Sequence, residues 1–287
     1  MCPWAWGSEP VFRTLRTALA GRARWRRVYA VLFDDEDDPA PDPAAETAYY
    51  AGYVERIGAH THAPRAVRLD RVAASSWPSS LVAAAAELQG ADVAERVLRR
   101  LRETVFVRGE PADTLEAAVA AAHGVPDLDP VRLRSDAVSP GVLERVRADR
   151  AEARRPVPEV LSVQSGSPHP GAAKETADGG HRYALPTLLL RTPSGSRAVP
   201  GWRPYEVYAS AVEELCPGLR DSWTPLSPSE ALERHRSLTE PERLLLAEGV
   251  WPPPGAVARV TGNGFLWLHP DEASERPGMR TEPPAPL

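Results

Sequence analysis

The sequence predicts an α/β fold that contains a large all-helical insertion and ends in a small α+β tail. Two β-rich, apolar runs, at residues 25–33 and 183–191, have the composition of buried strands. Between them, residues 44–154 show helical periodicity almost throughout. Residues 218–270 contain signals for two short helices and a hairpin, and residues 271–287 have the composition of a disordered tail. Residues 1–43 and 155–217 are therefore expected to form the two parts of the sheet domain.

The N-terminal region predicts a helix followed by a strand. Residues 9–20 place Val11, Phe12, Leu15 and Leu19 on one helical stripe, and proline is tolerated in a first turn. The strand at 25–33 ends in apolar residues and is expected to be buried on both faces near its end. The acidic, proline-rich residues 34–43 predict a surface loop, with a cation site as the weaker alternative.

Four helices are predicted within the insertion, at residues 79–90, 92–106, 114–122 and 139–154. Asp113 is the expected N-cap of the third helix, and Ser139, followed by Pro140, is the expected N-cap of the fourth. Residues 155–180 are rich in proline, glycine and serine and predict a loose connection. The strand at 183–191 is interrupted by Pro186, a residue that central strands rarely admit. Residues 197–199 are its expected partner, and residues 204–215 form an amphipathic helix.

The tail carries its own start signals. Ser227 with Glu230, and Thr239 with Glu242, have the spacing of capping boxes. Residues 256–261 and 265–269 flank Gly-Asn-Gly and predict a hairpin. Two short helices and a hairpin resemble the wing region of a winged helix. The arginines of this tail are balanced by glutamates, so DNA binding is not predicted.

Composition limits the classes of function. The 287 residues are 43% hydrophobic and 25% charged, with a net charge of −5, which argues against nucleic-acid and anionic-membrane partners. No apolar stretch is long enough to span a membrane, and the N-terminus lacks the pattern of a signal peptide, so we expect a cytoplasmic protein. Two cysteines form neither a disulfide framework nor a metal site. The oligomeric state and the substrate are left open.

The motif Cys2-Pro3-Trp4-Ala5 stands directly before the first predicted helix. A thiol in that position lies near unpaired backbone N–H groups and the positive end of the helix dipole, both of which favour the nucleophilic thiolate. The motif therefore predicts a reactive Cys2 with a lowered pKa, against the alternative of a cysteine without a role. His60 and His62 lack further ligands nearby in the sequence, so no metal site is predicted.

Taken together, these motifs resemble the DsbA-like thioredoxin family. The resemblance rests on Cys-Pro-Trp before a helix, on Ala184-Leu185-Pro186-Thr187 at the head of a strand, and on short phrases in between, and it covers about residues 2–215. It implies that Pro186 is a cis-proline beside Cys2, and that Leu185 and Thr187 contact the substrate. Ser76, otherwise an N-cap candidate, would line the same site.

The sequence departs from this family at two places. Ala5 stands where dithiol members have their second cysteine, so a mixed disulfide at Cys2 could not be resolved within the molecule. The resemblance then implies a low-molecular-weight thiol as cosubstrate and no bound cofactor, as in the glutathione-dependent isomerases and transferases of the family. The strand that precedes the Cys-Pro motif in the family is missing, and we interpret this as a natural start upstream of Met1.

Three hypotheses follow. The first is an enzyme of thiol–disulfide exchange or thiol transfer that acts on a small thiol or a thiol-containing substrate through Cys2. The second is a catalytically silent thioredoxin-fold scaffold that binds a ligand or partner in the same groove. The third, DNA binding by the tail, has the least support.

Overall fold

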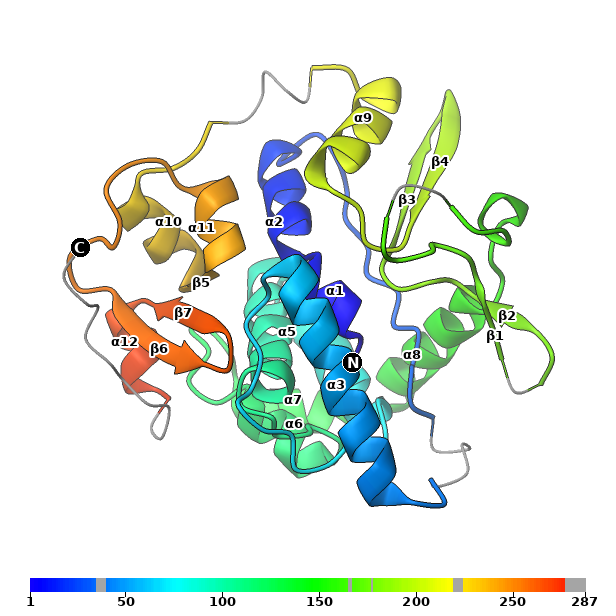
Figure 1. Ribbon diagram of the computed structural model, residues 1–287, viewed down its shortest axis with the longest axis horizontal. Helices are drawn as coiled ribbons and strands as arrows, with labels where there is room; N and C mark the ends of the chain where they lie inside the picture. The colour runs from blue at the N-terminus through cyan, green and yellow to red at the C-terminus, as the bar shows by residue number, and fades with distance from the viewer. Residues whose placement is uncertain (35–39, 165–166, 177, 219–223, 277–287) are drawn as a thin grey trace.

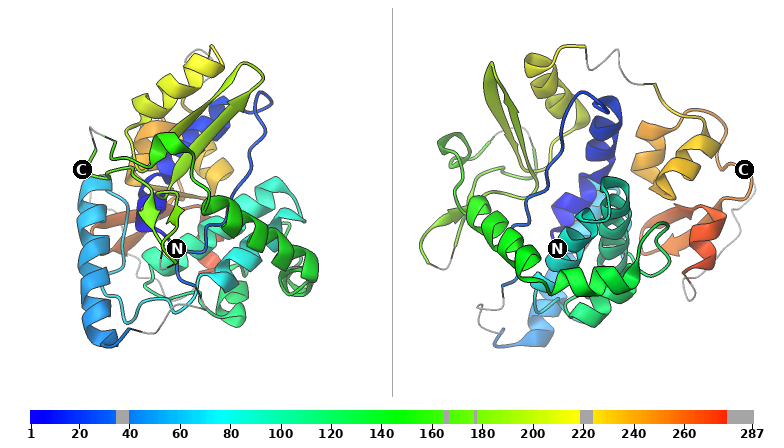
Figure 2. Two further views of the ribbon diagram at one scale, coloured as in Figure 1. Left: turned by 90° about the vertical axis from the view of Figure 1, so that its right-hand side faces the viewer. Right: turned by 180° about the vertical axis from the view of Figure 1, so that it is seen from behind.

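The computed structural model describes residues 1–34, 40–164, 167–176, 178–218 and 224–276. A block of helices occupies the middle of the molecule, with a two-stranded sheet and its covering helix on one side and the C-terminal tail on the other (Figure 1). Seen from behind, the tail still lies apart from the two-stranded sheet, with the helices between them (Figure 2). Among the described helices, none is both long and apolar enough to cross a lipid bilayer.

The chain begins with two consecutive helices, α1 (Pro3–Gly7) and α2 (Glu9–Ala18). Ser8 separates them, and its hydroxyl donates to the Trp4 carbonyl at 2.8 Å. The apolar stripe predicted for residues 9–20 packs, with Leu15 fully buried, against the two-stranded sheet and α9 (Tyr205–Leu215). This packing fixes the direction in which α1 points its N-terminal end.

The strand predicted at residues 25–33 is wrong: the segment pairs with no strand among the described residues. Several of its backbone groups are bonded instead to side chains of α8 (Pro140–Ala153) and of Arg154, which caps that helix, and those of Phe33 are bonded to Ser76. The Asp149 carboxylate accepts from the Tyr29 N–H at 3.4 Å, and Arg154 donates to the Ala30 carbonyl at 3.1 Å. A strand needs hydrogen bonds to a neighbouring backbone. A run whose backbone N–H and C=O groups bond to side chains therefore forms no β-strand, although its composition is that of one.

The helical insertion is confirmed and contains more helices than predicted. It comprises α3 (Pro43–Thr61), α4 (Trp77–Glu87), α5 (Ala91–Phe106), α6 (Leu115–Ala121), α7 (Pro130–Ala137) and α8. Its core is a cluster of valines, leucines and alanines in which Val82, Val97 and Leu101 are fully buried. The N-cap predicted at Asp113 is wrong. Thr114 caps α6, because Asp113 instead binds Arg71 and the Ala74 N–H.

The sheet of this domain is the hairpin β3 (Thr187–Thr192) and β4 (Gly195–Pro200). The strands are antiparallel, in a register that runs from Thr187 opposite Pro200 to Thr192 opposite Gly195. The predicted strand thus begins four residues late, after Pro186, since the chain bends at residues 185–186. The connection predicted to be loose holds a 3₁₀ turn (Pro158–Val160) and a second hairpin, β1 (Lys174–Glu175) with β2 (His181–Arg182).

The tail confirms both capping boxes and the hairpin. Ser227 caps α10 (Pro228–His235) and Thr239 caps α11 (Glu240–Leu246), each through the predicted glutamate. Strands β6 (Val257–Thr261) and β7 (Gly264–Leu268) are joined by β5 (Ser237–Thr239), which was not predicted, into a sheet of order β5-β7-β6. Disorder from residue 271 is wrong as far as the structure describes the chain: α12 (Pro270–Ser274) packs there with Glu272 buried. Residues 277–287 lie outside the described residues.

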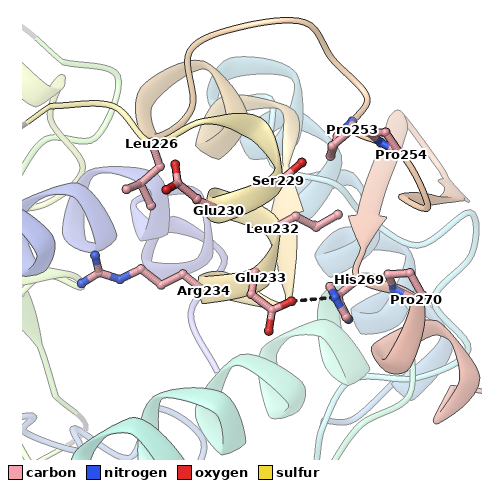
Figure 3. Close-up of a pocket in the computed structure, with 10 residues that line it drawn as sticks. All are labelled: Leu226, Ser229, Glu230, Leu232, Glu233, Arg234, Pro253, Pro254, His269 and Pro270. Atoms are coloured by element: carbon pink, nitrogen blue, oxygen red, sulfur yellow. Dashed lines mark ion pairs between the residues drawn. The ribbon is translucent and has the colours of Figure 1, made fainter.

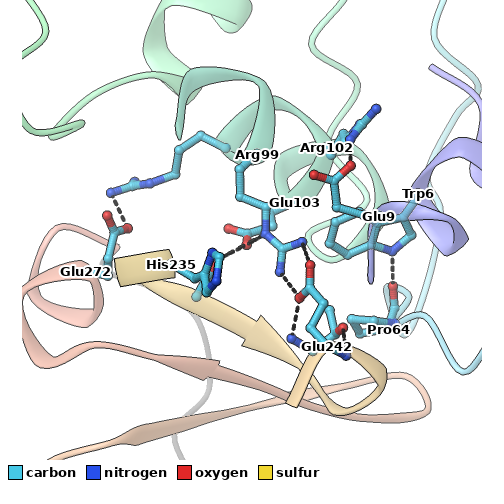
Figure 4. Close-up of polar contacts among 12 residues, drawn as sticks. Trp6, Glu9, Pro64, Arg99, Arg102, Glu103, His235, Glu242 and Glu272 are labelled. Carbon is cyan, nitrogen blue, oxygen red and sulfur yellow. Dashed lines mark hydrogen bonds and ion pairs between the residues drawn. The ribbon is translucent and has the colours of Figure 1, made fainter. Parts of the chain in front are cut away.

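Buried ion pairs attach the tail to the helical block (Figure 4). Arg99 on α5 donates to both carboxylate oxygens of Glu242 on α11, at 2.9 and 2.8 Å. Glu103, one turn further along α5, pairs with Arg99 and with Arg276, which follows α12. Burial alone would raise the pKa of Glu103, but Arg276 and Arg99 outweigh it and lower the pKa to about 2. The contacts between tail and block are therefore ionic as well as apolar.

Candidate functional site around Cys2

Cys2 and the Pro186 loop are neighbours in space although 183 positions separate Cys2 from Leu185. Cys2 is the N-cap of α1, with extended backbone, and Pro3 occupies the first helical position. The thiol donates to the Leu185 carbonyl oxygen, with the sulfur 3.5 Å away. The Leu185–Pro186 peptide bond is cis. The structure thus brings together the residues that the family resemblance singled out at the two ends of the domain.

The Pro186 loop, residues 184–187, is held in place by hydrogen bonds within the loop and to the residue that follows β4. The Thr187 hydroxyl donates to the Ala184 carbonyl at 2.6 Å, and the Gly201 N–H donates to the Pro186 carbonyl at 2.7 Å. Gly201 lies directly after β4, so the loop is tied to both strands of the sheet. The Leu185 carbonyl is consequently presented to the thiol by a fixed backbone.

The prediction of a lowered Cys2 pKa is wrong. Burial raises the pKa of the Cys2 thiol above its ordinary value of 9.0, and the backbone N–H groups of Ala5 and Trp4 and the Arg182 charge offset this only in part. The motif indicated the helix N-terminus correctly. It carried no information on the side chains that cover the sulfur.

Aromatic side chains form a wall behind the thiol. Trp4 is buried, and its indole N–H donates to the Tyr53 hydroxyl on α3 at 2.9 Å. Its ring meets His169 edge-on at 5.1 Å, and Trp202 lies 6.4 Å away. His60, at the end of α3, packs on Trp202 at 4.5 Å. His60 is exposed, and it adds to this wall from the last turn of α3.

His169 belongs to no sequence motif and was not among the predicted residues. It is 4% exposed, its Nδ1 accepts from the Gly171 N–H at 3.0 Å, and the Leu185 backbone lies near enough to act on its pKa. Burial, together with the charges of Lys174 and Arg203, lowers its pKa to about 4, so the ring is neutral at pH 7. Nδ1 is an acceptor, so the ring proton is on Nε2. The neutral ring therefore borders the Cys2 site, where it packs on Trp4.

Three further polar side chains surround Cys2. The Tyr50 hydroxyl on α3 donates to the Met1 carbonyl at 3.3 Å. Burial and the neighbouring Cys2 charge raise the pKa of Tyr50 and of Tyr53. Arg182 on β2 is half-buried, and its charge favours the thiolate form of Cys2. Neither the tyrosines nor Arg182 belong to a motif, and only the folded chain places them here.

The remaining predicted residues lie in three different settings. Ala5 is partly exposed on α1 beside the thiol. Ser76 is buried at the start of α4, where its hydroxyl accepts from the Phe33 N–H at 3.0 Å; no hydrogen bond links it to Cys2 or Leu185 in the described chain. Cys216 caps α9 and accepts from Arg22 beyond the far end of α2. Both cysteines are free.

Two other features of the molecule bear on where a site could lie. No group of three histidine, cysteine, aspartate or glutamate side chains with metal-binding geometry occurs in the described ranges. A pocket of about 590 Å³ lies in the tail beside α10, lined by Leu226, Leu232, Pro253, Pro254 and His269 among others (Figure 3). Glu233 binds His269 across it at 2.8 Å. It shares no residue with the Cys2 site.

Comparison with known proteins identifies the fold. No protein-family model matches the chain, and no curated protein matches it in sequence. Among solved structures, the chain is similar to a protein from Nitrosomonas europaea described as a putative protein disulfide isomerase. The match has a TM-score of 0.54 at 16% identity, and it covers 78% of this chain and 92% of the other. The likeness supports a thioredoxin-like α/β fold with a helical insertion and a C-terminal α+β tail. At this identity the comparison speaks to the fold and not to the activity.

Proposed function

We propose that this chain catalyses thiol–disulfide exchange or thiol transfer, with Cys2 as the nucleophile and the backbone of Leu185, Pro186 and Thr187 as the surface on which the substrate rests. The observation that carries the proposal is the 3.5 Å contact between the Cys2 sulfur and the Leu185 carbonyl oxygen, over the start of α1. Deprotonation of Cys2 removes the donor to this carbonyl, which could then accept a hydrogen bond from a substrate aligned with residues 185–187. The fold of the solved neighbour is consistent with this chemistry.

The reaction begins with loss of the Cys2 proton to solvent. The thiolate attacks one sulfur of a disulfide, a new S–S bond forms at Cys2, and the other sulfur leaves as a thiolate with the bonding electrons. Because Ala5 offers no second thiol and Cys216 lies beyond the far end of α2, the mixed disulfide is released by an external small thiol. That thiol attacks the mixed disulfide and restores the Cys2 thiolate, so the cycle has no net requirement for an oxidant.

The groups around Cys2 determine the pH at which the reactive thiolate forms. The N–H groups of Ala5 and Trp4 and the Arg182 guanidinium are the groups that stabilise the thiolate once it forms. Burial opposes them and keeps the resting thiol protonated at pH 7. The activity is therefore expected to rise with pH.

A silent binding scaffold is the second candidate, and the raised pKa of Cys2 is the observation that favours it. A protonated thiol that donates to a backbone carbonyl is a stable structural contact. Ala5 fits this alternative equally well. In the first candidate the Cys2 sulfur is the nucleophile, whereas in the second it is only a structural hydrogen-bond donor.

Replacing Cys2 by serine separates them. We expect Cys2→Ser to abolish the reduction of hydroxyethyl disulfide by reduced glutathione, whereas Cys216→Ser retains it within about twofold, because Cys216 is not in the site. Both variants should keep the thermal stability of the parent. Equal activity in all three proteins, or no activity above buffer in the parent at pH 9, would contradict the enzymatic proposal. The cytoplasmic location stays a prediction.

A further inference from the structure

The hairpin that leads into the Pro186 loop carries two cations on one face. In the register of β1 and β2, Lys174 stands directly opposite Arg182. Residues directly opposite in an antiparallel pair project from the same face, and like charges in that position are unfavourable. Lys174 is exposed and Arg182 is half-buried. The β1–β2 hairpin thus holds two positive charges side by side, and each charge destabilises the other.

No carboxylate relieves this repulsion in the described ranges. Neither Lys174 nor Arg182 takes part in an ion pair among the described residues, and the Arg182 guanidinium donates to the Tyr183 carbonyl at 3.1 Å. Glu175 is opposite His181 and so belongs to the other face of the hairpin. Asp178 in the connecting turn accepts from Thr176 at 2.5 Å and from the Gly180 N–H.

Both cations border the Cys2 site. Arg182 precedes Leu185 by three residues, and its charge interacts with those of Cys2 and Tyr53. The charge of Lys174 acts on His169, whose ring packs on Trp4 of the same site. An anion bound between the two cations would therefore lie next to the sulfur and the carbonyl on which the proposed chemistry depends.

We propose that Lys174 and Arg182 bind the negatively charged group of the thiol or disulfide substrate, so that the site selects small thiols carrying a carboxylate over neutral ones. This inference rests on the proposed function. A carboxylate would supply the charge that the hairpin lacks, and guanidinium groups bind carboxylates through two parallel hydrogen bonds. The same contact would orient the substrate sulfur toward Cys2.

The test compares two disulfides on protein that carries Cys216→Ser, so that Cys2 is the sole thiol. One is dithiobis(nitrobenzoate), which is anionic, and the other is dipyridyl disulfide, which is neutral; both release a coloured thiol on reaction. The second-order rate constants are measured at low and high salt for the parent, for Lys174→Gln and for Arg182→Gln. Arg197→Gln is the matched control, because Arg197 is paired with Glu214 on β4 and α9.

We expect each hairpin variant to lower the ratio of the anionic to the neutral rate constant by on the order of tenfold at low salt, and high salt to reduce this effect. Arg197→Gln should leave the ratio unchanged. The ratio is the readout because a change in the Cys2 pKa alters both rate constants alike. Unchanged ratios in both variants, with normal reaction of the parent, would overturn this inference and leave the proposed function standing. No reaction of the folded parent with either disulfide would overturn both.

Discussion

Cys2 and Pro186 are the residues that the sequence allowed us to find, because each belongs to a short pattern with a known place in a fold. Cys-Pro before a helix and Leu-Pro-Thr at the head of a strand locate both sides of the site. His169, Tyr53 and Arg182 belong to no such pattern. They come near the thiol only because α3, the 155–180 connection and the β1–β2 hairpin fold over it. The burial that results raises the Cys2 pKa, against the prediction.

The reactivity of Cys2 should follow its raised pKa. In the Cys216→Ser protein, we expect alkylation of Cys2 by iodoacetamide to be slower at pH 7 in the folded than in the urea-unfolded state. The folded rate should climb about tenfold per pH unit toward pH 9, because the thiolate fraction does so below the pKa. Rates followed by mass spectrometry across pH 6 to 10 measure this. A plateau already reached below pH 8 would show a thiolate that burial does not suppress.

His169 should make folding stability depend on pH. Its pKa is lowered from 6.5 to about 4 in the folded state, because burial disfavours the imidazolium. The unfolded chain therefore binds the proton more readily. The stabilisation is complete above pH 6.5 and is lost progressively as the pH falls toward 4.

Urea unfolding of the parent and of His169→Gln, between pH 7 and 4, tests this difference. The variant should show a smaller loss of stability over that range. His123→Gln serves as control, because His123 has a largely exposed side chain and should leave the slope unchanged. Identical slopes for the parent and His169→Gln would contradict the account of this ring.

At the scale of elements, helix starts could be predicted from local sequence, whereas the pairing of strands could not. The capping boxes at Ser227 and Thr239 were located correctly because the four residues from the N-cap to the glutamate are enough to mark the start of a helix. Residues 25–33 have the composition of a strand, yet whether they form one depends on a neighbouring backbone, and here side chains from α8 and Arg154 take that place. β1 and β2 are two residues each, too short for any periodicity to show.

The attachment of the tail depends on the pair Arg99–Glu242. Glu242 is fully buried, so Glu242→Gln leaves Arg99 without its bidentate partner in the same surroundings. We expect this variant to lose about 3 kcal/mol of unfolding free energy, which corresponds to a fall in Tm of about 10 °C. Glu240→Gln, which affects a half-exposed pair with Arg243 on the same helix, should cost no more than about 0.5 kcal/mol. Calorimetry that finds equal losses would show that the buried pair does not anchor the tail.

At the scale of the whole molecule, the order of its parts could be predicted because each part has a distinct pattern: the Cys-Pro helix, the helical insertion, the Pro186 strand and the capped tail. The docking of the tail could not be predicted. It depends on an arginine on α5 meeting a glutamate 143 positions later, and the spacing of either residue says nothing about the other. Arg99 also stacks on Trp6 of α1, with its guanidinium carbon 4.6 Å from the ring centre, so the tail and the helix that bears Cys2 share one contact.

The central claim is that Cys2 and the Leu185–Pro186–Thr187 backbone form one site for a small thiol. A crystal structure of the Cys216→Ser protein with glutathione in mixed disulfide on Cys2 tests it most directly. We expect the attached thiol to lie along residues 185–187, with hydrogen bonds to the Leu185 backbone. An adduct that points away from this loop, or a folded protein whose Cys2 accepts no adduct at pH 9, would contradict the claim.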